Sequence, residues 1–121
     1  MRMSARLVNT AASIAVLVGC LSLVAPAVSV AGAVEEGKKI AFSRKKGNCL
    51  ACHTIEGGKL PGTIGPTLIA MKSRYPNKSD LKKQISDARV KEPNTIMPPF
   101  GSHQILSPSE IDKVVEFIYT L

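Results

Sequence analysis

The sequence predicts a small all-α domain with about three core helices joined by glycine- and proline-rich loops. Apolar residues recur at helical spacing in residues 34–46, from about residue 79, and in residues 107–121. The segments between them, 56–66 and 92–102, are rich in glycine and proline. No segment alternates apolar and polar residues as a half-buried strand would. These observations together favour helices around one core.

Residues 1–33 have the composition of a cleaved signal peptide. Arg2 and Arg6 make a basic start, a long uncharged apolar stretch follows, and Ala31-Gly32-Ala33 supplies a small-x-small cleavage site. We therefore expect export to the periplasm and one mature domain, residues 34–121.

Two alternatives concern this segment. If cleavage failed, the uncharged run 7–34 is long enough to anchor the chain in a bilayer. Leu17-Val18-Gly19-Cys20 resembles a bacterial lipoprotein box, in which Cys20 would be acylated. A lipoprotein tether is normally polar, whereas residues 21–33 are almost wholly apolar, which favours the signal peptide and no stable membrane span after cleavage.

The pentapeptide Cys49-Leu50-Ala51-Cys52-His53 follows the first predicted helix and is the attachment signature of c-type haem. On one helical turn, positions three and four apart share a face. Both thiols can then reach the haem vinyl groups while His53 turns its imidazole to the iron. We expect one covalent haem c, with thioethers to Cys49 and Cys52 and with His53 as an axial ligand.

Zinc, a redox dithiol and a disulfide are the alternatives for this motif. A structural zinc site wants four ligands, and the further candidates are His53, adjacent to Cys52, and the distant His103. A thioredoxin-like dithiol would need a flanking βαβ pattern, and a bare disulfide would leave His53 without a role.

Met71, Met97 and His103 are the candidates for a second axial ligand. Met97 is favoured, because the prolines of Met97-Pro98-Pro99 restrict the backbone and hold an extended loop. Met71 lies in a helical or turn stretch, and His103 follows a flexible Gly101-Ser102. The alternative for Met97 is a gap-filling methionine of the core.

With His53 and Met97 on the iron, no coordination position is open to a substrate. The expected role is therefore single-electron transfer, and no catalytic residue is predicted. The imidazole of His53 should donate its other ring N–H to a carbonyl, which sets its tautomer. Because the mature chain has few aromatic residues, haem is expected to complete the core and the apo-protein to be poorly folded.

The last two helices have clear patterns. In the second, Leu81, Ile85 and Ala88 share one face. In the third, Ser107-Pro108-Ser109-Glu110 supplies an N-cap, a proline at the first helical position and a capping-box glutamate. The apolar stripe that follows predicts core packing; it consists of Ile111, Val114, Val115, Ile118 and Leu121.

From residue 34 onward, 14 Lys and Arg face 9 Asp and Glu, a net charge of about +5 before haem is counted. Several of these cations flank the haem motif: Lys38, Lys39, Arg44, Lys45 and Lys46. They would either steer an acidic redox partner or simply keep the chain soluble. Because they are not interleaved with stacking aromatics, no nucleic-acid partner is expected.

The order of these features resembles class I cytochromes c: a first helix with Gly37, the haem motif, a Gly65-Pro66 turn, a Met-Pro loop and an amphipathic last helix. The resemblance implies that the first and last helices cross at Gly37 and that the Pro66 carbonyl orients His53. It also implies that Met97 is the distal ligand. Phe42 stands one place later than the aromatic residue of many members.

Longer strings resemble a narrower family, SoxX, the small monohaem subunits of SoxAX cytochrome complexes of sulfur oxidation. They include Pro61-Gly62-Thr63-Ile64-Gly65-Pro66 and Met97-Pro98-Pro99-Phe100-Gly101. This resemblance implies a heterodimer with a SoxA-type cytochrome subunit, an L-cysteine S-thiosulfotransferase that conjugates thiosulfate to a cysteine of the SoxYZ carrier. The catalytic haem would belong to the SoxA-type subunit, and this chain would relay electrons to an accepting cytochrome.

The alternative function is that of a free periplasmic monohaem cytochrome c that shuttles electrons. The two hypotheses share every haem ligand. They differ in whether an apolar rim, expected to include Ile64, Pro98, Pro99 and Phe100, is covered by a permanent subunit or left open for transient docking.

Overall fold

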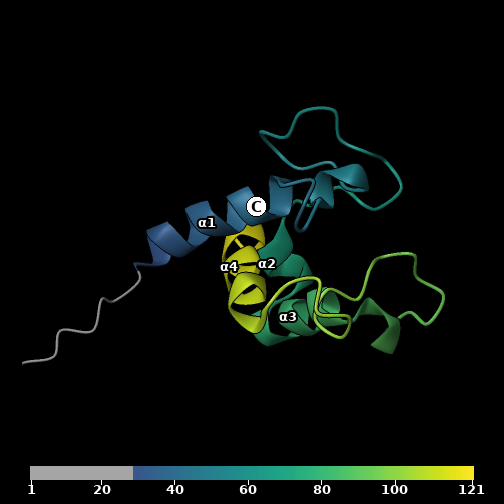
Figure 1. The fold of residues 1–121 in the computed structure, drawn as a ribbon. Coiled ribbons are helices and arrows are strands. Elements are labelled where there is room, and N and C mark those ends of the chain that lie inside the picture. The colour runs from purple at the N-terminus through teal and green to yellow at the C-terminus, as the bar shows by residue number, and fades with distance from the viewer. Residues whose placement is uncertain (1–28) are drawn as a thin grey trace, which may run out of the picture.

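The computed structural model describes residues 29–121, and within them it contains only helices and irregular loops (Figure 1). The all-α prediction is confirmed. The predicted basic start, apolar stretch and Cys20 lie outside the described residues. The elements in chain order are α1 (Val30–Phe42), the 3₁₀ turn η1 (Cys49–Ala51), α2 (Met71–Arg74), α3 (Lys78–Ser86), the 3₁₀ turn η2 (Ala88–Val90) and α4 (Pro108–Ile118).

Helix α1 begins and ends about four residues earlier than the sequence predicted. The side chain of Ser29 caps its start by accepting a hydrogen bond from the Gly32 amide at 3.2 Å. At its end, the amides of Ser43 and Gly47 both donate to the carbonyl of Ile40, so the chain turns away before the haem motif. The predicted cleavage after Ala33 would remove the first turn of α1, and it stays a prediction.

Helices α1 and α4 cross in direct backbone contact, with α1 lying over α4 (Figure 1). A Cβ atom on Gly37 would lie 1.9 Å from the carbonyl oxygen of Lys113, so a glycine is required at this point. The ring of Phe42 packs edge-on against Phe117, with 5.7 Å between the centroids. Phe42 thus reaches α4 although it stands one residue later than expected.

Helix α4 forms the centre of the core and has the predicted capping box. The Glu110 amide donates to Ser107 Oγ at 3.2 Å, and the Ser107 amide donates to Glu110 Oε2 at 2.9 Å. The apolar stripe is buried as predicted, apart from the half-buried Leu121. The buried members are Ile111, Val114, Val115 and Ile118, and Phe117, which was not part of the predicted stripe, is buried as well.

The single-turn helix α2 lies where the sequence predicted a helical or turn stretch around Met71, although four residues are too few to show a helical period. It is fixed by tertiary contacts: the Met71 amide donates to the Leu121 carbonyl at 2.9 Å, and the Tyr119 hydroxyl donates to the Pro76 carbonyl.

The two predicted loops extend from the helices on the same side of the molecule (Figure 1). Among residues 29–121, no helix is long and apolar enough to cross a membrane.

Candidate functional site

A largely apolar cavity of about 500 Å³ lies between the haem-motif segment, the two long loops and helices α2, α3 and α4. The structure brings all of the sequence-predicted site residues to its walls. These are Cys49, Cys52, His53, Pro66 and Met97. Several buried core residues also line it, among them Met71, Leu81, Ile85, Phe100, Val114 and Ile118, so the cavity is continuous with the hydrophobic core.

The haem motif is folded as a tight turn whose geometry is set locally. Asn48 has a left-handed φ of 46° and begins the 3₁₀ turn, and the amides of Cys52 and His53 both donate to the Cys49 carbonyl. The two thiols are not joined by a disulfide. Burial raises the pKa of the Cys49 thiol to about 11. A redox dithiol needs the opposite shift, so the structure disfavours that alternative.

His53 is held by the turn at Gly65-Pro66. Its Nδ1 lies 2.7 Å from the Pro66 carbonyl oxygen, which is the contact that the resemblance implied. When Nδ1 carries the proton and donates it to this carbonyl, the lone pair of Nε2 is free for a metal. The sequence reasoning missed the part played by Gly65. A Cβ atom there would lie 2.5 Å from His53 Cε1, so the imidazole packs directly on this glycine.

The three candidates for the second axial position have different surroundings. Met97 and Met71 both line the cavity, and the Met97 amide donates to Thr95 Oγ1 at 3.2 Å. The sulfur of Met71, a residue only 2 % exposed, accepts a hydrogen bond from Arg74. His103 is exposed and lies outside the cavity lining, with Nε2 3.4 Å from Arg89 Nη1. Met97 is favoured because the Met71 sulfur is already bound by Arg74 and His103 lies outside the cavity lining. The role of Met97 as a ligand stays a prediction.

The predicted apolar rim is partly wrong. Ile64 and Pro98 are exposed, but Pro99 and Phe100 are buried. Phe100 joins the core because the next residue, Gly101, is tied through its amide to the Ser86 carbonyl at the end of α3. Besides the predicted Ile64, which is 67 % exposed, two further exposed isoleucines line the cavity: Ile96 at 74 % and Ile105 at 41 %.

The charged residues that line the cavity all have the same sign. Among the described lining residues, Arg44, Lys46 and Arg74 are cationic and none is acidic. Lys46 pairs with Glu110 at the start of α4, and Arg74 donates to the Thr67 carbonyl at 3.1 Å. The site is therefore an apolar cavity whose charged lining residues are all positive.

Comparison with known proteins gives three similarities. The family model for cytochrome c matches residues 34–121. A chain of the crystal structure of SoxXA from P. pantotrophus is similar with a TM-score of 0.65 and 29 % identity, over 72 % of this chain and 80 % of that one. An uncharacterized lipoprotein of Aquifex aeolicus (strain VF5) is 32 % identical over 76 residues, which are 62 % of this chain but only 37 % of that protein.

The residues of the site fit haem c, the covalently bound cofactor of the cytochrome c family. The cavity has apolar walls, two unpaired thiols lie on one turn, and an imidazole can present Nε2 because Pro66 engages Nδ1. A thioether side chain, Met97, lies in the same cavity lining. No group of three or more His, Cys, Asp and Glu side chains that could hold a bare metal ion occurs in residues 29–121.

Proposed function

The chain belongs to the cytochrome c family, and from this premise we propose that it is the electron-transfer haem subunit of a SoxAX-type complex. The similarities support a SoxX-type monohaem cytochrome. Covalent haem c, once bound, supplies a one-electron redox couple. The roles of the protein are to hold that group, set its potential and dock a partner.

In this proposal, Cys49 and Cys52 would bind haem through thioethers, and His53 and Met97 would supply the two protein ligands of its iron. The Pro66 carbonyl accepts the Nδ1 proton of His53 and so leaves the lone pair of Nε2 free for the iron. A thioether from Met97 favours a higher potential than a more electron-donating ligand would. Because both axial positions would be filled by the protein, no substrate is expected to bind at the iron.

The observation that carries the proposal is the similarity to a chain of the SoxXA structure, which extends over 80 % of that chain. We infer a SoxA-type cytochrome as the permanent partner and thiosulfate conjugation to a SoxYZ-type carrier as the reaction served. Joining a thiol to thiosulfate releases two electrons, whereas a single haem accepts one. Turnover would then need a second redox site, or two successive transfers to an accepting cytochrome.

The surface around the cavity supports docking of a partner. Ile64, Ile96 and Ile105 are large exposed apolar residues at the cavity lining, and the charged residues beside them are cationic. An apolar patch beside positive charge fits an interface with an acidic protein surface.

We further propose a periplasmic location, with residues 1–33 as a cleaved signal peptide and residues 34–121 as the mature domain. The similar Aquifex protein is named a lipoprotein, which is consistent with export. Acylation of Cys20 is the competing route, and mass spectrometry of the mature N-terminus distinguishes a free Val34 from a lipidated cysteine.

The proposal is tested by purifying the tagged full chain from thiosulfate-grown cells and identifying its partners by haem staining and mass spectrometry. A larger c-type cytochrome should co-elute at equal stoichiometry. Thiosulfate together with the carrier should then reduce the haem in the complex and leave the isolated chain oxidised.

Two variants sharpen this test. Ile96→Asp alters the apolar lining and should release the partner, whereas Ile69→Asp changes an exposed isoleucine that does not line the cavity and should retain it. Elution of the wild type as a lone haem protein, from cells that express the sulfur-oxidation system, would instead favour the free electron shuttle.

A further inference from the structure

The loop that carries Met97 leaves and rejoins the helical core at one place, the end of α3. On the outgoing side, the Glu92 amide donates to the Ala88 carbonyl at 3.0 Å. On the returning side, the amides of Gly101 and Ser102 donate to the Ser86 carbonyl at 2.9 and 3.3 Å. We call residues 86–89 together with 101–103 the loop neck.

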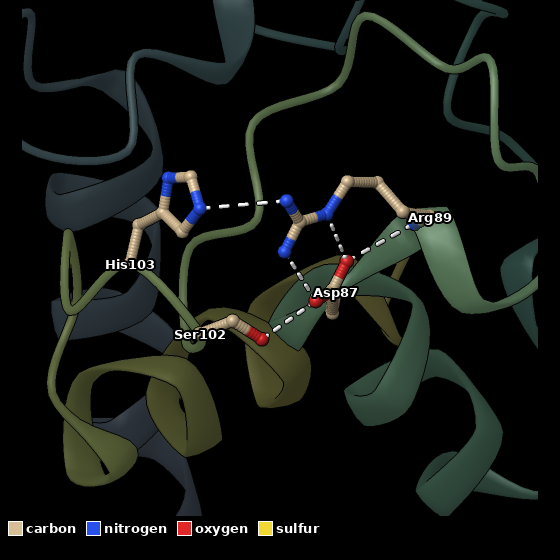
Figure 2. A network of polar contacts seen from close by, with 4 residues as sticks. All are labelled: Asp87, Arg89, Ser102 and His103. Carbon is tan, nitrogen blue, oxygen red and sulfur yellow. Dashed lines mark hydrogen bonds and ion pairs between the residues drawn. The ribbon is translucent and has the colours of Figure 1, made fainter.

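Asp87 is the centre of this neck (Figure 2). Its carboxylate accepts hydrogen bonds from Arg89 Nε at 2.8 Å and Nη2 at 2.7 Å, and from the Ser102 hydroxyl at 2.7 Å. It also caps η2 by accepting from the Arg89 amide at 3.2 Å. Arg89 Nη1 in turn lies 3.4 Å from His103 Nε2. One side chain therefore connects the segment before the loop with the segment after it.

The contacts within the cluster favour the charged forms of Asp87 and Arg89. The Arg89 guanidinium and the Ser102 hydroxyl hold the pKa of Asp87 well below its usual range, and Asp87 raises the pKa of Arg89. The Asp87 side chain in its ion pair is 19 % exposed, so water screens it less than a fully exposed surface pair.

Few other hydrogen bonds hold the tip of the loop. In the described part of the chain, the hydrogen bonds of residues 93–98 all stay between Glu92 and Met97. The position of Met97 therefore depends on packing in the cavity and on the two ends of the loop. Compact loops of this kind are held where their ends meet.

We propose that Asp87 is a positioning residue for Met97, closing the neck of the loop that presents the thioether to the haem iron. This inference rests on the proposed function, in which Met97 is the distal ligand. Opening of the neck would let the loop swing out and expose the iron to small ligands from solution. Asp87 thus limits the population of the open, Met-dissociated form.

The test is the affinity of the ferric, haem-loaded full chain for imidazole, which can bind only after Met97 leaves. The observed affinity scales with the fraction of molecules whose loop is open. Asp87→Ala should tighten imidazole binding about tenfold, because it removes charge-assisted bonds on both sides of the neck. Ser102→Ala removes one of these bonds and should tighten binding by a few-fold.

Asp80→Ala is the matched control, because Asp80 lies on α3 and pairs with Lys83 but forms no hydrogen bond or ion pair with the described residues of the loop neck. Its imidazole affinity should stay within about twofold of the wild type. The inference is overturned if Ser102→Ala and Asp87→Ala also stay within that range, or if Asp80→Ala changes as much as they do. Ser102→Ala keeps the test decisive even if Asp87→Ala fails to fold.

Met97→Ala separates this inference from the proposal on which it rests. Loss of the long-wavelength band of thioether-ligated ferric haem in Met97→Ala, with unchanged imidazole affinity in the neck variants, would overturn the role of Asp87 alone. Persistence of that band in Met97→Ala would show that the distal ligand itself is misassigned.

Discussion

His53 is held on two sides by one turn, with the Pro66 carbonyl at Nδ1 and Gly65 against the ring. Gly65→Ala would place a Cβ atom 2.5 Å from His53 Cε1, so the ring must turn and its bond to Pro66 must weaken. We expect a high-spin ferric fraction in the electron paramagnetic resonance spectrum and a loss of about 2 kcal/mol in stability. Thr63→Ala, an exposed change in the same loop, is the control.

Met97 and Met71 should respond differently to substitution. Met97→Ala should abolish the thioether band and lower the reduction potential by at least about 59 mV, a tenfold change in a one-electron equilibrium. Met71→Leu conserves volume in the core and should keep the band. Redox titration of both variants, followed optically, would contradict the assignment if Met97→Ala kept both the band and the potential.

The crossing of α1 and α4 depends on a single glycine. Gly37→Ala would bring a Cβ atom to 1.9 Å from the Lys113 carbonyl oxygen, and backbone cannot move as a flexible side chain can. The helices must separate, which should cost about 3 kcal/mol in the free energy of unfolding measured with denaturant. Glu35→Ala, on the exposed part of the same helix, should change stability by less than about 0.5 kcal/mol.

The ion pair and capping box at the start of α4 should make the free energy of unfolding decrease at low pH. The Lys46 ammonium and the Ser107 amide lower the pKa of Glu110 from 4.5 to about 2. Because the folded pKa is the lower one, this contribution is complete above pH 4.5 and is lost as the pH falls towards about 2. In Glu110→Gln, the free energy of unfolding should therefore fall less steeply as the pH is lowered from 4.5 towards about 2.

Denaturant unfolding across this acid range measures the effect. Asp112→Asn is the control, because it removes a carboxylate from the same helix but leaves the capping box intact. Added salt should reduce the part that comes from Lys46, since this pair is exposed. The prediction would be contradicted if the free energy of unfolding of Glu110→Gln fell as steeply with decreasing pH as that of the wild type.

Several residues belong both to the hydrophobic core and to the cavity wall, so we expect the folding of the whole domain to depend on haem. Met71, Leu81, Ile85, Val114 and Ile118 are at once core residues and cavity lining. Without haem the cavity would be left unfilled, and its apolar walls would lose the packing contacts of the group that occupies it. The variant Cys49→Ala/Cys52→Ala, made without haem, should therefore lack a native-like near-UV circular dichroism spectrum. A native-like spectrum would contradict this prediction.

Much of the fold could be predicted because its signals are local. The capping box at Ser107 and the stripe on α4 lie within a few turns of one helix, and both are confirmed. The boundaries of α1 could not be predicted, since the carbonyl of Ile40 takes the amide of Gly47 only once the chain has turned. Helix α2 was predicted only as a helical or turn stretch around Met71, because contacts with the C-terminal residues hold it in place.

The sequence by itself determined the helical class, the haem-attachment motif and the set of candidate ligands, because each depends on residue types at short spacing. Only the tertiary structure decided which candidates line the cavity, that Phe100 is buried, that Gly65 packs on the His53 ring, and that Asp87 accepts a hydrogen bond from Ser102. These features depend on contacts between residues far apart in the chain, and such contacts exist only after the chain has packed.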